Sequence, residues 1–440
     1  MSIQKIPPSY DPIVRKFELP YWLVKIKEDP AVRRMMSIRQ LGLKGYIDFP
    51  GAIHVRYSHA LGVMVLANKT TDFLINKMNE KGNRSIKDSL KLNRDTLIAA
   101  GFFHDIGHGP FSHTVDFAMQ KISGKTHEDY AEDVLTKYLP SDLENSINIK
   151  QVVKLIQNKH DYPFLSQIID GPLDVDKLDY LLRDAYYVGL NYRFDLDYFL
   201  DSYTILGDPE NLNSCKLGIE NTIQARASAE LFLVLWKNMY DLVYHIEASR
   251  IAEKMLEKAI LLNKDNSEIK NCFCDIERFV ELTDDELLKV LSQLDVQTVD
   301  LIKGIKSGKI YSVIIDKELD QKQFKMPSEF LNALKTPLQI SEISDTLSKQ
   351  LNQKLEQTDY TYIVDIIGSR APKEIPIDLQ DEKTGEYAVL REKSPIIGAI
   401  QETKLIKVYA NNTIKKNIDE TGLNTLKAAL GEIVEGFKVE

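Results

Sequence analysis

Histidines are concentrated in one part of this 440-residue chain, and this constrains the fold more than any other feature. Six of the eight lie between His54 and His127, and three fall within residues 103–113, which read FHDIGHGPFSH. Imidazole is neutral near pH 7 and is a common nitrogen ligand for metal ions. An adjacent His-Asp pair followed by two glycines and two more histidines is not typical of core packing. The fold must therefore bring distant polar side chains together around this segment.

Most of the chain before residue 309 has the apolar periodicity of α-helices, with Gly/Pro turns between the periodic stretches. After residue 309, short segments rich in β-branched and aromatic residues alternate with turn residues. The sequence predicts a mainly α-helical body, residues 1–308 with a metal core at about 50–200, and a smaller C-terminal α+β lobe, residues 309–440. The expected helices are 61–78, 96–104, 127–139, 152–158, 228–262, a helical stretch 263–308 and a last helix 422–437, and the expected strands are 309–315, 360–367, 386–391 and 404–410.

The composition limits the classes of partner and the compartment. The net charge of −9 argues against nucleic acid as the main partner, because a phosphate backbone requires a basic surface. No apolar stretch approaches the roughly 20 residues that span a bilayer, and the N-terminus lacks the apolar segment of a secretion signal. Three cysteines, Cys215, Cys272 and Cys274, are too few and too badly spaced for a disulfide framework. We therefore expect a cytoplasmic protein with no membrane contact.

His104 and Asp105 form an adjacent pair of candidate metal ligands. On a helix their side chains diverge by about 100°, so both reach one ion only in a cleft that other segments complete. The upstream candidate is His59, with Arg56 one turn earlier on the same helix face. The downstream candidate is Asp176. Two imidazoles and two carboxylates suit Mn, Fe, Ni, Co or Zn better than the all-oxygen shell of Mg, so we expect a divalent transition metal.

The segment around Asp176 has one polar and one apolar helix face. With Asp176 at zero and about 100° per residue, Tyr180, Asp184 and Lys177 fall at about 40°, 80° and 100°, and the leucines of 178–182 lie opposite. A solvent-exposed helix laced with salt bridges would show the same pattern. Beside the His-Asp pair, we favour a site in which the ion polarises a phosphoryl oxygen while Arg56 and Lys177 bind phosphate oxygens.

Further candidates lie in His108, His113 and the pair His127-Glu128. Each histidine taken alone is more often a satisfied structural residue. Glu128 also has a structural interpretation, because Thr126 can cap a helix whose first turn favours acidic residues. The functional interpretation is that Glu128 orients His127 for general acid or base catalysis.

At these residues the chain resembles the HD-domain phosphohydrolases, specifically the deoxynucleoside triphosphate triphosphohydrolases related to bacterial dGTPases and to the vertebrate enzyme with sterile-alpha-motif and HD domains. The helical body and the mixed C-terminal lobe also fit the layout of that family. The matching blocks extend over about 250 residues, at 11–12, 40–42, 49–52, 56–59, 104–116, 127–128 and 174–184.

The resemblance implies a reaction and a role for each matching residue. The products would be a deoxynucleoside and inorganic triphosphate, with one transition metal per subunit and Mg²⁺ accompanying the substrate phosphates. The implied metal ligands are His59, His104, Asp105 and Asp176; the implied catalytic residues at the α-phosphorus are His127 with Glu128, and His113, with His108 contacting phosphate.

The remaining implied residues recognise the substrate. Arg56 and Lys177 would bind the triphosphate. Gln40, Tyr180 and Asp184 would recognise the sugar 3′-hydroxyl, whereas Leu41 and Tyr244 would crowd the position of a 2′-hydroxyl. A tightly packed pocket discriminates against an added hydroxyl, and buried polar groups penalise an absent one.

Two positions depart from the family pattern. Where relatives place an arginine toward the terminal phosphate, this chain has Trp236, with Lys237 beside it. Where many relatives have lysine after the shared tyrosine, this chain has Glu247. Replacing cations by tryptophan and glutamate should weaken the binding of a tetra-anion unless Lys237 or Arg226 substitutes.

Two alternatives therefore stay open. Beside a dNTP triphosphohydrolase, the first alternative is an HD phosphohydrolase of another nucleotide or phosphoester, and the second is a nucleotide-sensing protein with an idle site. The complete His/Asp set argues against the second, because unpaired buried polar groups are costly to keep. The resemblance also implies a homo-oligomer, dimer or tetramer, with a nucleotide activator at its subunit interfaces.

Overall fold

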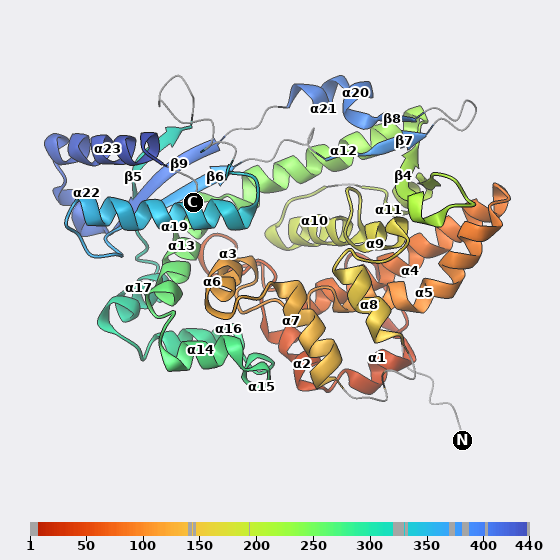
Figure 1. The fold of residues 1–440 in the computed structure, drawn as a ribbon, viewed down its shortest axis with the longest axis horizontal. Coiled ribbons are helices and arrows are strands. Elements are labelled where there is room, and N and C mark those ends of the chain that lie inside the picture. Colours follow the sequence, from red (N-terminus) through yellow and green to blue (C-terminus); the bar gives the residue numbers. More distant parts are fainter. Residues whose placement is uncertain are drawn as a thin grey trace.

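The structure is a computed structural model that describes residues 8–139, 143, 147–192, 194–319, 330, 333–368, 375–380, 387–400 and 404–437. Helices dominate, and small sheets lie at the edges of the helical body (Figure 1). The predicted fold class, a helical HD-type bundle with a smaller α+β lobe, is confirmed.

Two long helices form the centre of the body. α4 (Arg56–Glu80) and α5 (Arg84–Phe103) lie side by side, and α10 (Val175–Val188) packs across α4. Their facing residues are small or apolar, such as Ala60, Ala67 and Ala100, which are fully buried and allow close packing. The other helices before residue 203 are α1 (Tyr21–Ile26), α2 (Pro30–Arg34), the 3₁₀ turn η1 (Met35–Ser37), α3 (Lys44–Ile47), α6 (His113–Ser123), α7 (His127–Asp133), the π-helix η2 (Val134–Tyr138), α8 (Ile149–Ile156), α9 (Pro163–Ile169) and α11 (Leu196–Asp201).

The expected continuous helix 228–262 is wrong. The chain forms α12 (Ile223–Met239), a π-helical turn η5 (Tyr240–Tyr244) and a separate helix α13 (Glu247–Leu262). The break needs no proline or glycine, because the N–H of His245 bonds to the Tyr240 carbonyl and Asp48, distant in sequence, accepts the Ser249 N–H at 2.9 Å. A side chain from elsewhere in the fold thus satisfies an amide in the first turn of the second helix.

The C-terminal lobe contains an antiparallel sheet of order β5-β9-β6, formed by β5 (Ser312–Glu318), β6 (Tyr362–Gly368) and β9 (Lys404–Ala410). It packs against α19 (Pro337–Lys354) and shares a core with α23 (Glu420–Glu435). These strands and the last helix lie close to their predicted positions. The remaining helices after residue 262 are α14 (Ser267–Cys274), α15 (Ile276–Phe279), α16 (Asp284–Leu291), α17 (Val296–Lys306), α20 (Leu390–Lys393), α21 (Pro395–Ala399) and α22 (Asn412–Asn417).

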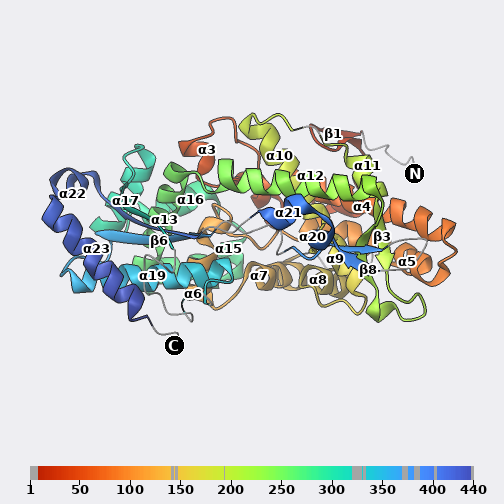
Figure 2. The ribbon, with the colours of Figure 1, turned by 90° about the horizontal axis from the view of Figure 1, so that it is seen from above.

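A second sheet, not predicted from the sequence, joins the lobe to the body. Its order is β3-β4-β7-β8, and β4 (Lys216–Glu220) pairs in parallel with β7 (Asp378–Gln380). β3 (Tyr203–Leu206) and β8 (Tyr387–Val389) complete it, and α21 lies against α12 (Figure 2). The predicted strand 386–391 is only partly correct: residue 386 lies outside the described residues, and a helix begins at Leu390. Residues 375–380 and 387–400 therefore lie on the body, although they follow the strand β6.

Two further observations bear on the sequence expectations. A short hairpin of β1 (Ser9–Asp11) and β2 (Arg15–Phe17) precedes the helices. Within the described part of the chain, no helix has the length and apolarity to cross a membrane. The three cysteines are free thiols.

Candidate metal centre

Four predicted ligands converge where α4, the end of α5 and α10 meet. His59 Nε2 lies 2.9 Å from Asp176 Oδ1 and 3.4 Å from Asp105 Oδ2. His104 Nε2 lies 3.3 Å from Asp105 Oδ1 and 3.5 Å from Asp176 Oδ1. Ligand atoms of His59, His104 and Asp176, which are distant in sequence, all lie within 4.8 Å of one another and are close enough to share one cation, and Asp105 adjoins both histidines.

The donor set fits a divalent transition metal. His104 Nδ1 donates to the Gly101 carbonyl at 2.9 Å, which leaves its Nε2 buried with no hydrogen-bond partner among the described residues. Such an orphaned buried acceptor is costly unless a ligand satisfies it. Burial acts to lower the pKa of His59, but the hydrogen bonds that its ring donates to Asp176 and Asp179 prevail and raise that pKa to about 10, so a cation would have to displace a proton there.

A chain of charged groups holds His59 through its other ring nitrogen, Nδ1. Its Nδ1 lies 2.8 Å from Asp179 Oδ2, and Arg183 donates to both oxygens of Asp179 at 2.7 and 2.9 Å. Arg183 also binds Asp11 in the N-terminal hairpin at 2.7 and 3.1 Å. This arrangement fixes the tautomer and orientation of a metal-binding histidine. Gly62 makes it possible, because a Cβ there would lie 1.8 Å from Asp179 Oδ1.

Arg56 connects the ligand cluster to the loop after it. Its Nη1 contacts Asp105, its Nε donates to Ser112 Oγ at 2.8 Å, and its Nη2 is buried without a hydrogen-bond partner among the described residues. A guanidinium with one unused buried donor beside a metal site is suited to bind a phosphate oxygen.

A second histidine cluster lies next to the first. His108 stacks on His127 with ring centroids 4.0 Å apart, and Asp116 lies 3.3 Å from His108 and 2.9 Å from His113. Glu128 Oε1 lies 3.1 Å from His127 Nε2. Burial and the nearby charges of Arg56 and His127 lower the pKa of His108 to about 4, so His108 is neutral near pH 7.

The position of Glu128 is compatible with both of its predicted interpretations. Thr126 caps α7, so Glu128 stands in the first helical turn, as the structural interpretation requires. Burial acts to raise its pKa, but the hydrogen bond to His127 prevails and lowers the pKa of Glu128 to about 2. It is therefore a permanent anion beside His127.

The predicted sugar-binding residues gather around Asp184. Tyr244 donates to Asp184 Oδ2 at 2.8 Å, and His54 Nε2 lies 2.7 Å from Asp184 Oδ1. The Tyr180 ring lies 6.1 Å from that of Tyr244. The Gln40 N–H donates to the His54 carbonyl at 3.0 Å, and the buried Gln40 Oε1 has no hydrogen-bond partner among the described residues. The next residue, Leu41, is buried.

Lys177 is held by carbonyl and carboxylate oxygens. Its Nζ donates to the Gly171 carbonyl at 3.1 Å and to Asp174. Burial opposes its charge, but Asp174 and Asp176 raise the pKa of Lys177, so it stays cationic.

The two departures from the family pattern have different surroundings. Trp236 is buried and packs on the Tyr240 ring at 4.6 Å. Glu247 binds Lys407 of the C-terminal lobe at 2.6 Å. Both proposed substitutes are engaged: Lys237 pairs with Asp241, and Arg226 donates to Asn221 at 2.8 Å.

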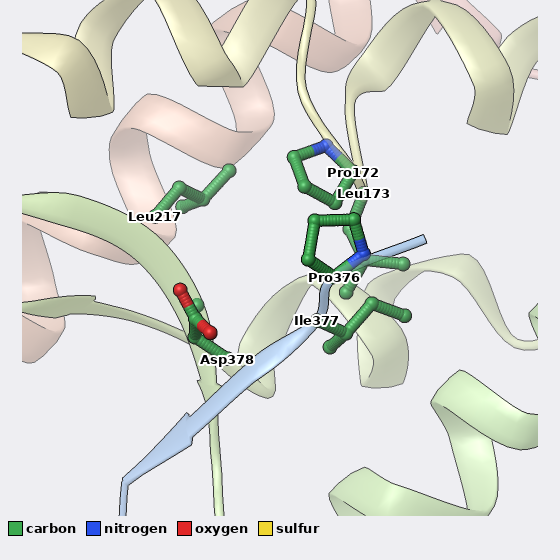
Figure 3. A pocket seen from close by; sticks show the side chains of 7 residues that line it. Pro172, Leu173, Leu217, Pro376, Ile377 and Asp378 are labelled. Atoms are coloured by element: carbon green, nitrogen blue, oxygen red, sulfur yellow. The ribbon is translucent and has the colours of Figure 1, made fainter. Parts of the chain in front are cut away.

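A small cavity of about 10 Å³ lies between the segment before α10 and the β4–β7 pair. Figure 3 shows that mostly apolar side chains line it, including Pro172, Leu217 and Ile377. It has room for about one water molecule and cannot admit a nucleotide. It is therefore not the substrate site.

Comparison with known proteins agrees with the geometry. Residues 56–184 match the family model of the HD domain, and residues 220–429 match the model of the HD-associated region. The chain therefore contains an HD domain followed by an HD-associated region. The HD-domain match begins at Arg56 and ends at Asp184, so it encloses every predicted metal ligand.

Individual relatives are similar over most of this chain. An uncharacterised protein of Methanocaldococcus jannaschii is 31% identical over 66% of this chain and 56% of its own length. The deoxynucleoside triphosphate triphosphohydrolase SAMHD1 of Homo sapiens is 27% identical over 93% of this chain and 71% of that enzyme. A solved phosphohydrolase of Bacteroides thetaiotaomicron, 23% identical, shares the fold with a TM-score of 0.68 over 92% of this chain and 100% of that one. This chain spans between 41% and 59% of the length of three curated relatives.

Sequence reasoning missed several residues of the site. Asp179 and Arg183 lie on the same helix as Asp176, at about 300° and 340° on the wheel used above, so a signal for them existed. His54 precedes Arg56 by two residues and lies in the histidine-rich part of the chain, but no role was predicted for it from the sequence. Asp116, which contacts two histidines, carried no distinguishing local pattern.

Proposed function

We propose that this protein is a metal-dependent phosphohydrolase that converts deoxynucleoside triphosphates into deoxynucleoside and inorganic triphosphate. The observation that supports it most is the convergence of His59, His104, Asp105 and Asp176, with an unpaired Arg56 donor beside them. The similarity to a named triphosphohydrolase adds support for the substrate class.

The metal would be held by those four side chains. When bound, a divalent transition metal supplies Lewis-acid polarisation of a phosphoryl oxygen. The donor set favours Mn, Fe, Ni, Co or Zn, and Mg²⁺ would accompany the substrate phosphates.

The chain's own residues would bind the phosphates and move protons. Arg56 is a buried cation that contacts Asp105, Lys177 is a half-buried cation next to Asp176 in the chain, and both would neutralise triphosphate charge. His127, held by the Glu128 anion, would give a proton to the 5′-oxygen as its bond to the α-phosphorus breaks. His113 and His108 complete the proton-transfer and phosphate contacts.

The sugar would lie against Asp184. Tyr244 and His54 occupy one oxygen each of its carboxylate and so fix its orientation toward a 3′-hydroxyl. Gln40 would supply a further acceptor, Tyr180 would pack on the sugar, and Leu41 with Tyr244 would exclude a 2′-hydroxyl. We also propose that the protein is cytoplasmic and forms a homo-oligomer, dimer or tetramer, with a nucleotide activator at its subunit interfaces. Each chain would consist of a body (1–308) and a lobe (309–440). It would bind neither nucleic acid nor membranes.

A second candidate is hydrolysis of another nucleotide or phosphoester. The burial of Trp236 favours it, because the side chain at that position packs in the core and offers no charge to a terminal phosphate. Glu247 does not add to that objection, since Lys407 neutralises it.

A substrate panel separates the candidates. Purified full-length protein with Mn²⁺ is incubated with each dNTP, NTP and cyclic dinucleotide, and products are resolved by ion-exchange chromatography. Free tripolyphosphate with a deoxynucleoside supports the first proposal, and monophosphate or pyrophosphate supports the second. No turnover of any compound contradicts both and leaves an idle, nucleotide-sensing site.

A further inference from the structure

Asp284 lies about 100 residues beyond the HD domain, yet its side chain reaches the loop that carries the catalytic histidines. It occupies the first turn of α16, where an acidic residue usually faces water and stabilises the helix dipole. Here Thr283 already caps the helix, accepting the Glu286 N–H at 3.3 Å, and Asp284 is only 3% exposed whereas Asp285 is exposed. Helix capping therefore does not explain its burial.

The Asp284 carboxylate accepts two backbone hydrogen bonds from different segments. Oδ1 accepts the Phe111 N–H at 2.7 Å, and Oδ2 accepts the Arg39 N–H at 3.0 Å. Residues 39 and 111 belong to separate parts of the site: Arg39 directly precedes Gln40, and Phe111 lies two residues before His113. A single buried carboxylate thus ties the two segments together.

The backbone that it holds is strained. Phe111 and Ser112 are consecutive non-glycine residues with φ of 59° and 57°. This left-handed region disfavours side chains with a Cβ, so the surroundings must impose it. Without a fixed acceptor for the Phe111 amide, the turn has an easier alternative conformation.

The strained turn positions two functional side chains. Ser112 precedes His113 at the start of α6, and its hydroxyl accepts from Arg56 Nε at 2.8 Å. The same hydroxyl donates to the Arg39 carbonyl at 3.0 Å, so Arg39 is held through both its N–H and its C=O. A shift of residues 111–112 would move His113, release Arg56 and loosen the segment before Gln40.

A second contact from the same region acts on the same loop. Arg34 donates to the Leu282 carbonyl at 2.9 Å, to the Ile106 carbonyl at 3.3 Å and to the His108 carbonyl at 2.5 Å. Residues 282–284 thus contact the loop 106–111 through an arginine on one side and a carboxylate on the other.

We propose that Asp284 is a positioning residue of the catalytic centre, through which the HD-associated region sets the geometry of the HD loop. Its effect on turnover rests on the proposed function, but its effect on the backbone does not. Asp284 touches neither substrate nor metal and acts through Phe111, Ser112 and Arg39.

The test compares Asp284→Asn with Asp285→Asn in the full-length, metal-loaded protein. The asparagine is isosteric but offers only one acceptor oxygen and turns an NH₂ toward a backbone N–H. Two quantities are measured on each variant: kcat and KM for the best dNTP, and hydrogen exchange of peptides covering residues 38–43 and 109–115. Metal content and melting temperature are recorded to confirm that both variants are folded and loaded.

We expect Asp284→Asn to lower kcat about 10- to 100-fold, with metal content retained and exchange accelerated in those two peptides, because small misplacements of catalytic groups have effects of this size. Asp285→Asn should leave both readouts unchanged. Unchanged kcat for folded, loaded Asp284→Asn overturns the proposal, as does a loss of kcat without faster exchange. If the wild type hydrolyses no nucleotide, the proposed function fails, and the exchange result alone then supports or overturns the positioning role.

Discussion

The two histidine clusters of this protein use the same residue types for different tasks. In the first, two imidazoles and two carboxylates direct their atoms to a common point, one nitrogen is left without a partner, and Asp179 and Arg183 brace the arrangement. In the second, Asp116 contacts both His108 and His113, Glu128 pairs with His127, and the His113 side chain is 75% exposed. A shared centre with an unpartnered ring nitrogen suits a cation, whereas histidines paired with carboxylates beside solvent suit proton transfer.

Geometry alone would permit a metal in the second cluster as well. Donor atoms of His108, Asp116 and His127 lie within 4.8 Å of one another, as do those of His59, His104 and Asp176. The difference is that, among the described residues of the two groups, only His104 Nε2 in the first is a buried ring nitrogen without a hydrogen-bond partner. Substitutions in the two clusters test whether they differ in this way.

The largest effect is expected when a member of the first cluster is removed. His104→Ala and Asp176→Ala should each lose bound metal and lower turnover by more than about 10³-fold with the fold retained, because the Lewis acid is lost. Metal content by mass spectrometry, circular dichroism and the dNTP assay check this. His160→Ala, outside both clusters, is the matched control. Full activity in either variant would refute the ligand assignment.

A change in the second cluster should separate chemistry from metal binding. Glu128→Gln removes the anion beside His127, and we expect about a 10²-fold lower kcat with normal metal content, in the range typical of general acid–base groups. Glu132→Gln, one turn later on the same helix, should behave as wild type. Loss of metal from Glu128→Gln would instead make the second cluster a metal site and erase the contrast.

Removing the charge of Asp179, which contacts His59 in the first cluster, should have an intermediate effect. Asp179→Asn removes the charge that orients His59, and metal affinity should fall about 10- to 100-fold. Competition with a chelator of known affinity measures this, with the exposed Asp197→Asn as control. An unchanged affinity would show that the His59–Asp179 contact is only structural.

The smallest effect is expected in the sugar region. Tyr244→Phe removes one hydrogen bond to Asp184 and should raise KM up to about tenfold, with metal content and kcat nearly unchanged. The exposed Tyr186→Phe is the control. A large fall in kcat would place Tyr244 in the chemical step and contradict its assignment to the sugar.

The sequence predicted the parts of the fold that depend on local periodicity. Helix α4 and the strands of the C-terminal sheet lie close to their expected positions because their apolar patterns are regular, whereas only the C-terminal part of α5 was predicted. The break at residues 245–246 was missed, since a distant carboxylate, Asp48, stabilises it. The β4–β7 pairing was missed because two short strands about 160 residues apart meet only in the folded chain.

The site shows the same division. His104 and Asp105 are conspicuous because they are adjacent, and His59 and Asp176 follow from their surroundings. The contacts of Asp284 with Phe111 and Arg39 join residues more than 170 positions apart, and local spacing carries no signal for them. Side chains that act by binding distant backbone groups are therefore the ones that cannot be predicted from a single sequence.

The most direct test of the central claim is the metal content of the native full-length protein beside that of His104→Ala and Asp176→Ala, purified without added metal and without chelators. We predict about one transition-metal ion per chain in the native protein and almost none in either variant. A native protein without transition metal after loading with Mn²⁺, Fe²⁺ or Zn²⁺, or variants that retain as much metal as the native chain, would contradict the account.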